Sequence, residues 1–486
     1  MFEYLKIAYR NIWRNKRRSL ITMSSIFFAA FLAIIMRSFQ LGSYDAMINT
    51  MVEKYTGHIQ IEHPDFPEDM TLDNAVVYSE ELLQKVRNVE NVKAIAPRIS
   101  SFSMAYSDIQ NKGILINGID PKAEEGMTGF SEQIAMVKLT DEAIAKIKAE
   151  GAPPFLQEAL DEYRGKYYAR DKILAFEMNL QSNDDIEKWL PVIKKHAFYP
   201  SQNLKENDEG LLIGSGLSNY LKLNVGDSII MLGMGYHGAS AAKVFPIRGV
   251  IVVPNPQLDA MIAYGCLKTV QDYFSAYEFA DSENGTGEKI PLLSSYVINV
   301  NRTDYESIQE TRDAVIRSLN DQSLLIRGWK EANKELNNQI KSDNETGKIM
   351  IGLLYIVIAF GVFGTVLMMI AERKREMGVM IAIGMKKRKL AILISLEMFF
   401  MSFMGLIAGI LVSMPIVAIG HLHPIRLKGE MAEMMATYGM EPVMPMAWFD
   451  MYYFNQMLVV FIVVLVIMIY PVIRIRRMNV IEALRG

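Results

Sequence analysis

The residues that could do chemistry are few and scattered along the chain. Of the six histidines only His421 and His423 are close together, and their setting is more typical of a loop than of a metal site. The chain has no His-Glu-x-x-His zinc pair and no Gly-x-x-x-x-Gly-Lys-Ser/Thr phosphate loop. Gly214-Ser-Gly lacks the third glycine of a dinucleotide site, and Cys266, the only cysteine, cannot form an intrachain disulfide. We therefore expect no catalytic residue, no metal site and no cofactor bound by this chain.

Four long apolar segments have the length of membrane-spanning helices. A hydrocarbon core about 30 Å thick requires roughly 20 apolar residues of helix, and we expect spans at 19–41, 349–371, 390–420 and 454–473. A buried core helix can be equally apolar, but four such segments favour a membrane protein. The predicted fold class is a membrane α-helical protein with four transmembrane helices and a large extracytoplasmic α+β domain, 42–348, inserted between the first and second.

The basic residues predict the orientation of these spans. Lysine and arginine are concentrated in 1–18, 372–389 and 474–486, and cytoplasmic flanks collect such residues. Both termini are therefore expected in the cytoplasm, with 42–348 and the loop 421–453 outside. No cleavage site follows the first span, which we interpret as a retained anchor. The net charge of −3 hides an acidic outer domain balanced by basic inner segments, and we expect no nucleic-acid partner.

The outer domain alternates between strand-like and helix-like sequence. Apolar residues at helical spacing in Phe39–Lys54 predict that the first span continues outward as a stalk, and Trp329–Ser342 reads as a second polar stalk. Strand patterns dominate between them, but from about 124 to 209 the sequence becomes charged and helix-forming. Gly233–Lys243 is glycine-rich and is predicted to be a loop between two strands.

Glu397 is the exception to the apolar character of the spans. A carboxyl group inside a membrane is costly and is a functional candidate by default. It lies about two turns from the basic residues that end the inner loop, so we favour a structural partner over a role in transport.

The most specific segment is the inner loop that begins at Glu372. It has charges first, then a short apolar run closed by Gly384, and then a basic cluster. This order predicts a short surface helix that ends at the glycine and offers an apolar side to a partner. A helix that merely lies on the membrane between positive charges is the simpler alternative.

The loop resembles that of FtsX-like ABC permeases, typically Glu-Arg/Lys-x-x-Glu-Ile-Gly-x-x-x-Ala-x-Gly. In that family the loop is the coupling helix that docks on a separate ATPase subunit, which favours docking over the simpler alternative. The matching residues are Glu372, Arg373, Glu376, Met377 in place of isoleucine, Gly378, Ala382 and Gly384. The tail Pro471-x8-Val480-Ile-Glu-Ala-Leu-Arg and the opening Ala8–Ser19, part of an amphipathic N-terminal helix at 1–18, also resemble the family.

The resemblance implies an FtsX-like or MacB-type (type VII) ABC transporter permease of the bacterial inner (cytoplasmic) membrane. Its members transmit motion from the ATPase, which holds ATP and magnesium, to the outer domains and pass no substrate through the bilayer. It also implies membrane lipids around the spans and a dimer with a second permease copy or a paralogue.

Two segments resemble the lipoprotein-releasing LolC/LolE branch. Leu212–Asp227 is similar to a segment shared with MacB, and Gly328–Leu336 is closer to the LolC/LolE branch. That branch releases lipoproteins from the inner membrane to a periplasmic carrier. The residues of the matching carrier hairpin are Gly233, Gly235, Tyr236, His237 and Gly238, although a simple hairpin tip is an equal alternative. Acyl chains would enter between the first two spans, past Phe27, Phe28, Phe31 and Met36.

Two other functions remain open. An FtsX-like regulator would transmit ATPase strokes to an extracytoplasmic cell-wall hydrolase, and a MacB-like exporter would drive efflux of amphiphiles or peptides.

Overall fold

The computed structural model describes residues 10, 12–13, 16–108, 110–180, 182–253, 255–279, 289–427, 429 and 443–479. The chain forms two compact units. The helical unit comprises Met1–Ala46, Asn338–Leu427 and Val443–Gly486, and the α+β unit comprises Met47–Asn337 and Lys428–Pro442.

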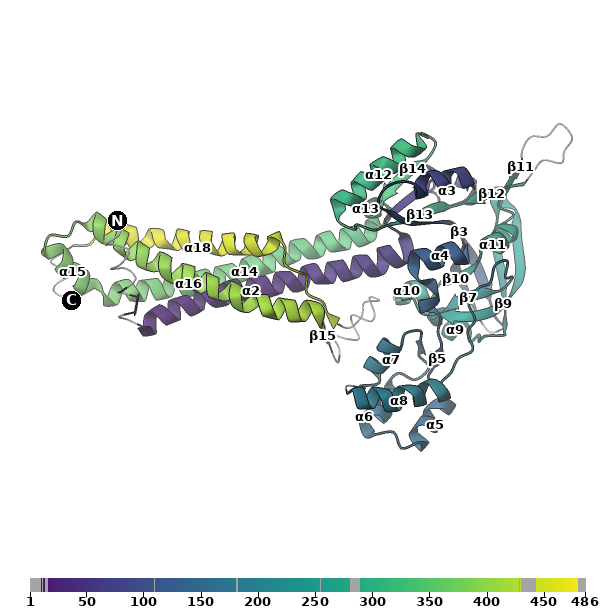
Figure 1. The fold of residues 1–486 in the computed structure, drawn as a ribbon, viewed down its shortest axis with the longest axis horizontal. Coiled ribbons are helices and arrows are strands. Elements are labelled where there is room, and N and C mark those ends of the chain that lie inside the picture. Colours follow the sequence, from purple (N-terminus) through teal and green to yellow (C-terminus); the bar gives the residue numbers. More distant parts are fainter. Residues whose placement is uncertain are drawn as a thin grey trace. The chain divides into compact units, whose positions relative to one another are not determined.

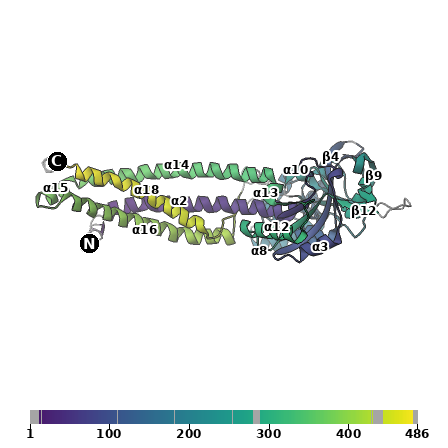
Figure 2. The same ribbon diagram turned by 90° about the horizontal axis from the view of Figure 1, so that it is seen from above.

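Four long helices make up most of the helical unit and run alongside one another (Figures 1 and 2). Each is long and apolar enough to cross a membrane. They are α2 (Lys16–Ile48), α14 (Lys334–Glu372), α16 (Lys387–Leu422) and α18 (Met451–Arg476), with the short helix α15 (Lys374–Ala382) between α14 and α16 and the strand pair β15 (Ile425–Arg426) and β16 (Val443–Met444) between α16 and α18.

Glycines let α2 and α16 approach closely. A Cβ atom on Gly405 would lie 2.6 Å from the carbonyl oxygen of Met23, and one on Gly409 would lie 2.9 Å from that of Phe27. Small residues at such contacts are the usual means of packing helices in a membrane, where water supplies no hydrophobic driving force. The backbone of α2 therefore contacts α16 directly.

A chain of polar side chains joins α2 and α14 where the apolar segment of α2 ends and that of α14 begins. Arg37 donates hydrogen bonds to Gln40 Oε1 at 2.7 Å and to Asn344 Oδ1 at 2.8 Å. The Gln40 amide donates to the Tyr44 hydroxyl at 2.8 Å, which donates to Asp343 Oδ2 at 2.6 Å. Both charged groups in this network, Arg37 and Asp343, have hydrogen-bond partners. The network therefore holds α2 and α14 together at the point where their polar residues begin.

A nine-stranded sheet forms the α+β unit, in the order β14-β1-β13-β3-β4-β10-β7-β9-β8. The pairs β4–β10 and β7–β9 are parallel and the others antiparallel. The strands are β1 (Ile59–Glu62), β3 (Val92–Tyr106), β4 (Asn111–Ile119), β7 (Leu211–Gly214), β8 (Ser228–Met234), β9 (Ser240–Ile251), β10 (Ile262–Cys266), β13 (Ser295–Val300) and β14 (Leu325–Gly328).

The length of β3 closes part of this sheet into a barrel. Its first half pairs with β13, while Ser103–Tyr106 at its end pair with β8 as well as with β4. Six strands, β3, β4, β10, β7, β9 and β8, therefore form a closed ring, and β13, β1 and β14 extend from it as an open sheet.

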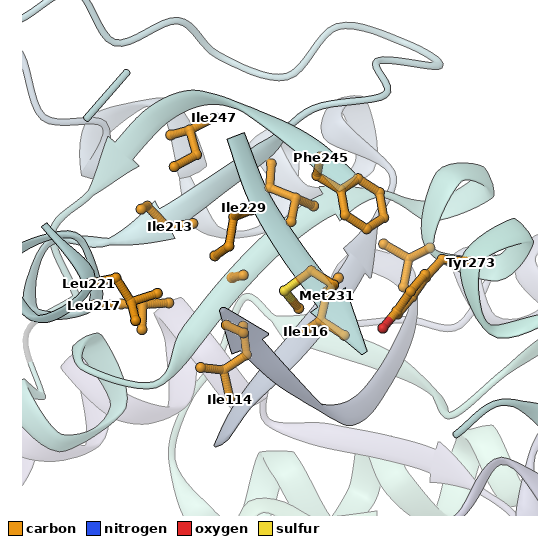
Figure 3. Packing of buried hydrophobic residues seen from close by; sticks show 14 of the residues in the cluster. Ile114, Ile116, Ile213, Leu217, Leu221, Ile229, Met231, Phe245, Ile247 and Tyr273 are labelled. Carbon is orange, nitrogen blue, oxygen red and sulfur yellow. The ribbon is translucent and has the colours of Figure 1, made fainter. Parts of the chain in front are cut away.

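Apolar side chains fill this barrel (Figure 3). Ile114, Ile229, Met231 and Phe245 point inward from β4, β8 and β9, and Tyr273 packs beside them from α11 (Leu267–Phe274). The alternation of inward and outward residues along each strand produces this arrangement. The barrel core is thus built from segments more than 100 residues apart in the sequence.

The remaining elements of the α+β unit are short. Helices α5 to α8 follow one another within the predicted insertion and share a core that includes Leu156, Trp189 and Ile193. The other helices are α3 (Glu80–Arg87), α4 (Pro121–Thr128), α9 (Ser215–Leu221), α10 (Pro256–Asp259), α12 (Tyr305–Leu319) and α13 (Trp329–Ala332), and those of the insertion are α5 (Asp141–Ala149), α6 (Pro154–Glu162), α7 (Asp171–Glu177) and α8 (Asn183–His196). The short strands are β2 (Val76–Val77), β5 (Val137–Lys138), β6 (Tyr167–Tyr168), β11 (Tyr277–Phe279) and β12 (Lys289–Leu293).

Two predicted segments differ in detail from the structure. The helix that continues the first span changes at Asn49 from an α-helix to a π-helix, η1 (Asn49–Thr56). The predicted loop Gly233–Lys243 is wrong in extent, because β8 and β9 stay paired as far as Met234 and Ser240. A Cβ on Gly233 would lie 2.5 Å from Ser103 Oγ, so this glycine serves close strand packing and not loop flexibility.

Truncation of the barrel core should destabilise the α+β unit. Phe245→Ala removes a fully buried ring and should lower the free energy of unfolding by about 3–5 kcal/mol, through lost burial and the cavity that remains. Urea unfolding of the full chain in detergent, followed by tryptophan fluorescence, would measure it. The neighbouring Val244→Ala is the control: Val244 is 57% exposed and should cost under about 0.5 kcal/mol. Equal effects would contradict the inward assignment of Phe245.

Candidate functional site

The helix α15 is set off from both of its neighbours by breaks in the backbone. Arg373 leaves the helical conformation at its start (φ −94°, ψ 5°), and Gly384 has a φ of +108° just beyond its end. Only glycine adopts that conformation without strain. The predicted short helix that ends at Gly384 is confirmed.

One side of α15 is packed into the helical unit. Met377 is 1% exposed and belongs to the same apolar cluster as Leu390, Ile394 and Ile475, and Gly378 beside it is also buried. Lys387, at the start of α16, donates a hydrogen bond to the carbonyl oxygen of Met478 at 2.7 Å. The helix is therefore held against α16 and the end of α18.

A buried ion pair fixes the break between α14 and α15. The Arg373 guanidinium donates to Glu397 Oε2 at 2.5 Å, and the Glu397 side chain is only 3% exposed. A small cavity of about 30 Å³, room for about one water molecule, adjoins the pair and is also lined by Ser19, Thr22 and Thr365. An isolated charge here would be very costly, so each group makes the other tolerable. The sequence pattern predicts a structural partner for Glu397, and the structure supplies one in Arg373.

The opposite side of α15 is exposed. Arg375, Glu376 and Val379 are exposed within the helix, and Ile383, just after it, is 81% exposed. Val379 and Ile383 are four residues apart and share a face. This face has an apolar centre with charged residues before it, which is the composition of a protein-docking surface.

The seven predicted coupling residues therefore have two different positions. Glu372, Glu376, Ala382 and Gly384 are exposed, whereas Arg373, Met377 and Gly378 face the helical unit. Arg375, Val379 and Ile383 complete the exposed face but were not among the predicted residues. Their helical spacing was a signal that could have found them.

Several predicted features lie outside the described residues. They include the tail from Val480 onward and most of the N-terminal helix at 1–18, of which only Arg10, Ile12, Trp13 and Lys16–Arg18 are described.

Phe27, Phe28 and Phe31 of α2 form a row of rings in contact. The rings of Phe27 and Phe31 are parallel with centroids 5.7 Å apart, and Phe28 meets Phe27 edge to face at 5.0 Å. Phe28 is 54% exposed, while Phe27, Phe31 and Met36 are partly buried. The structure brings these residues to one stretch of helix, and the carbonyl of Phe27 contacts α16.

The predicted carrier hairpin is a tight turn between β8 and β9. Tyr236 and His237 stack at its tip with ring centroids 3.9 Å apart, and the backbone N–H of His237 donates to Asp73 Oδ1 at 2.8 Å. His237 and Gly238 both have positive φ. The tip is therefore tied to the segment η2 (Leu72–Asn74).

Within the described ranges, no group of three or more histidine, cysteine, aspartate or glutamate residues could hold a metal ion.

Comparison with known proteins gives a family match for the segment that contains α15. Residues 348–480 match the model of the FtsX-like permease C-terminal domain, a stretch that contains α15 with the helices on both sides. No curated protein matches the chain significantly.

Two solved structures resemble more than half of the chain. The extracellular domain of the noncanonic ABC-type transporter YknZ from Gram-positive bacteria is 11% identical, with 56% of this chain and 99% of that chain covered at a TM-score of 0.28. The periplasmic region of MacB from Actinobacillus actinomycetemcomitans is 9% identical, with 58% and 94% covered at the same TM-score.

Breaking the buried ion pair should destabilise the helical unit. Glu397→Leu leaves the Arg373 guanidinium buried without its carboxylate and should cost about 3–5 kcal/mol. The double variant Arg373→Met with Glu397→Leu should recover most of that loss. Thermal unfolding of the detergent-solubilised chain reports both. The exposed pair Lys348–Glu345 is the matched control, and Glu345→Gln should cost under about 1 kcal/mol. A double variant as unstable as the single one would show that the pair is not what holds the two groups in place.

Proposed function

We propose that this chain is the membrane subunit of an ABC transporter and transmits motion from a separate ATPase to its α+β unit. The single observation that carries the proposal is α15, a short helix within an FtsX-like permease C-terminal domain that exposes a charged and apolar face. The partner ATPase would bind ATP and magnesium and dock on this face. The chain itself would be non-catalytic.

The exposed face has the residues that such docking requires. Val379 and Ile383 supply an apolar centre, and Arg375 and Glu376 supply charges of both signs at its border. Burial of an apolar centre provides affinity, and the charges provide orientation and specificity.

The ion pair would make this docking mechanically useful. Because Arg373 precedes α15 directly and bonds to Glu397 on α16, a push on α15 is passed to α16 and not absorbed by a loose loop. The glycine contacts at Gly405 and Gly409 would pass it on to α2, the helix that continues into η1. Stiff packed elements transmit displacement in this way.

The work that we propose for the outer part is the release of lipoproteins from the inner membrane to a carrier. The support is the resemblance of Leu212–Asp227 and Gly328–Leu336 to the LolC/LolE branch. The row of Phe27, Phe28 and Phe31 offers an apolar path for acyl chains, and the tip at Tyr236 and His237 is a candidate carrier contact. Such a permease would act as a dimer with a second copy or a paralogue, with both termini of each chain in the cytoplasm.

Two other functions are compatible with the same membrane subunit. An FtsX-like regulator would control a cell-wall hydrolase, and a MacB-like exporter would move amphiphiles or peptides. In vivo crosslinking through photoreactive residues, one at Phe28 in α2 and one at Tyr236 in the α+β unit, followed by identification of the adducts, separates them. We expect acylated lipoproteins, and recovery of a hydrolase with no lipoprotein would overturn lipoprotein release as the function.

Charge reversal on α15 should uncouple the ATPase. Glu376→Lys changes an exposed charge beside the apolar centre, so we expect at least about tenfold weaker co-purification of the ATPase, which corresponds to about 1.4 kcal/mol. Ile383→Asp should have a similar effect because it places a charge in the apolar centre.

The control for both variants is Glu335→Lys, an exposed charge reversal at the beginning of α14. It should leave the complex and its ATP turnover unchanged. An intact complex with normal turnover in both α15 variants would contradict the docking assignment.

A further inference from the structure

His58 lies where the chain enters the sheet of the α+β unit. The eight residues before Gly57 form the π-helix η1. Gly57 has a φ of +70° and changes the direction of the chain before β1 begins. π-Helical turns are rare and frequently mark functional positions.

The backbone of His58 joins the first and last segments of the unit. Its N–H donates to the carbonyl oxygen of Ile298 at 2.9 Å, and its own carbonyl oxygen accepts from the N–H of Trp329, the first residue of α13, at 2.8 Å. Next to it the Asn333 amide donates to Thr56 Oγ1 at 2.9 Å. The segment that enters the unit and the segment that leaves it are therefore bonded to each other at this point.

Asn299 determines which ring nitrogen of His58 carries the proton. The Asn299 Nδ2 group donates to the carbonyl oxygens of Glu53 at 2.7 Å and of Met127 at 3.0 Å. Because both partners are acceptors, Nδ2 must face them, and Oδ1 must face His58 Nδ1 at 2.9 Å. Nδ1 therefore carries the hydrogen, and the neutral ring has a bare Nε2.

That bare nitrogen is buried without a partner. His58 is 1% exposed, and Nε2 has no hydrogen-bond partner among the described residues. Protonation would add a buried donor with no acceptor, which costs free energy that the neutral ring avoids. Burial lowers the pKa of the His58 imidazole, against the opposing effects of the Asn299 hydrogen bond and the Glu53 charge.

Two charged groups face the imidazole from neighbouring elements. Glu53 is on η1 and favours the imidazolium, Lys93 is on β3 and disfavours it, and the two are themselves paired at 3.0 Å. Neither Glu53 nor Lys93 forms a hydrogen bond with His58 Nε2.

We infer that His58 and Asn299 form a proton-sensitive joint that holds η1 against the sheet while the imidazole is neutral and releases it on protonation. The release follows from the geometry: the Nε2–H of an imidazolium finds no acceptor among the described residues, so the ring must move. That movement breaks the bond from His58 Nδ1 to Asn299 Oδ1 and shifts the residue whose Nδ2 holds the carbonyl oxygen of Glu53. The joint would make the outer unit responsive to external acidity. Any consequence for transmission through α2 rests on the proposed function, but the joint itself does not.

The direction of the pH dependence follows from the lowered pKa. At a pH above the ordinary histidine pKa of about 6.5, the imidazole is neutral in both the folded and the unfolded chain. The stability that the neutral ring contributes is then fully present. As the pH falls below that value, the unfolded chain binds more protons than the folded one, so stability is lost.

Hydrogen exchange of the full-length chain in nanodiscs tests the joint. We compare the amides of Asn49–Thr56 at about pH 7.5 and about pH 5, corrected for intrinsic exchange rates, and expect several-fold faster exchange at the lower pH. The amides of β7, in the barrel, should show no such change. His58→Asn places an uncharged amide donor near the position of Nδ1 and should abolish the difference, whereas His63→Asn, at a partly exposed histidine, should retain it. No acceleration in the unmodified chain, or an equal one in His58→Asn, would overturn the inference.

Two charge variants keep the test decisive if His58→Asn does not fold. Lys93→Gln removes the charge that disfavours the imidazolium and should move the midpoint of the exchange transition to higher pH. Glu53→Gln should move it to lower pH. Both are surface substitutions at a partly exposed pair, and an unchanged midpoint in both would refute the assignment of the transition to His58. The coupling of the ATPase through α15 is unaffected by either outcome.

Discussion

An arginine and a glutamate that neutralise each other inside an apolar helix bundle determine the geometry of the cytoplasmic face that we propose. Arg373 interrupts the helix at the end of α14 and bonds to Glu397 on α16 at the point where α15 begins. Neither charge could remain there alone. With the pair in place, Met377 is buried and Val379 and Ile383 are exposed, so one contact determines which side of α15 a partner can reach.

The α+β unit depends on a comparable constraint at its own boundary. Its first and last segments lie together and are joined by hydrogen bonds at His58 and Thr56. Beyond that junction, the long strand β3 closes the barrel by pairing with β8. His58 is buried at the junction, whereas Thr56 and Asn333 are partly buried, and hydrogen bonds of this kind favour one arrangement of the segments that they join.

The elements that could be predicted were those written in local sequence patterns. The four apolar helices and the short helix before Gly384 follow from length, periodicity and a glycine, and the structure contains them. The loop at Gly233 was misjudged because a glycine that permits close strand packing has the same local signal as one that permits a turn. Arg373 was expected among the docking residues because its motif shows identity and spacing but not the direction of a side chain.

Local sequence patterns were therefore enough to predict the class of protein: four membrane-length helices, an α+β block between the first two, and a charged loop at one end of the bundle. Hydropathy and helical period are properties of neighbouring residues, so no fold is needed to read them. Only the tertiary structure decided that Arg373 meets Glu397, that β3 closes a barrel, and that Asn299 leaves His58 Nε2 without a partner. Those contacts join residues from 24 to 241 positions apart, and their geometry depends on how whole elements pack.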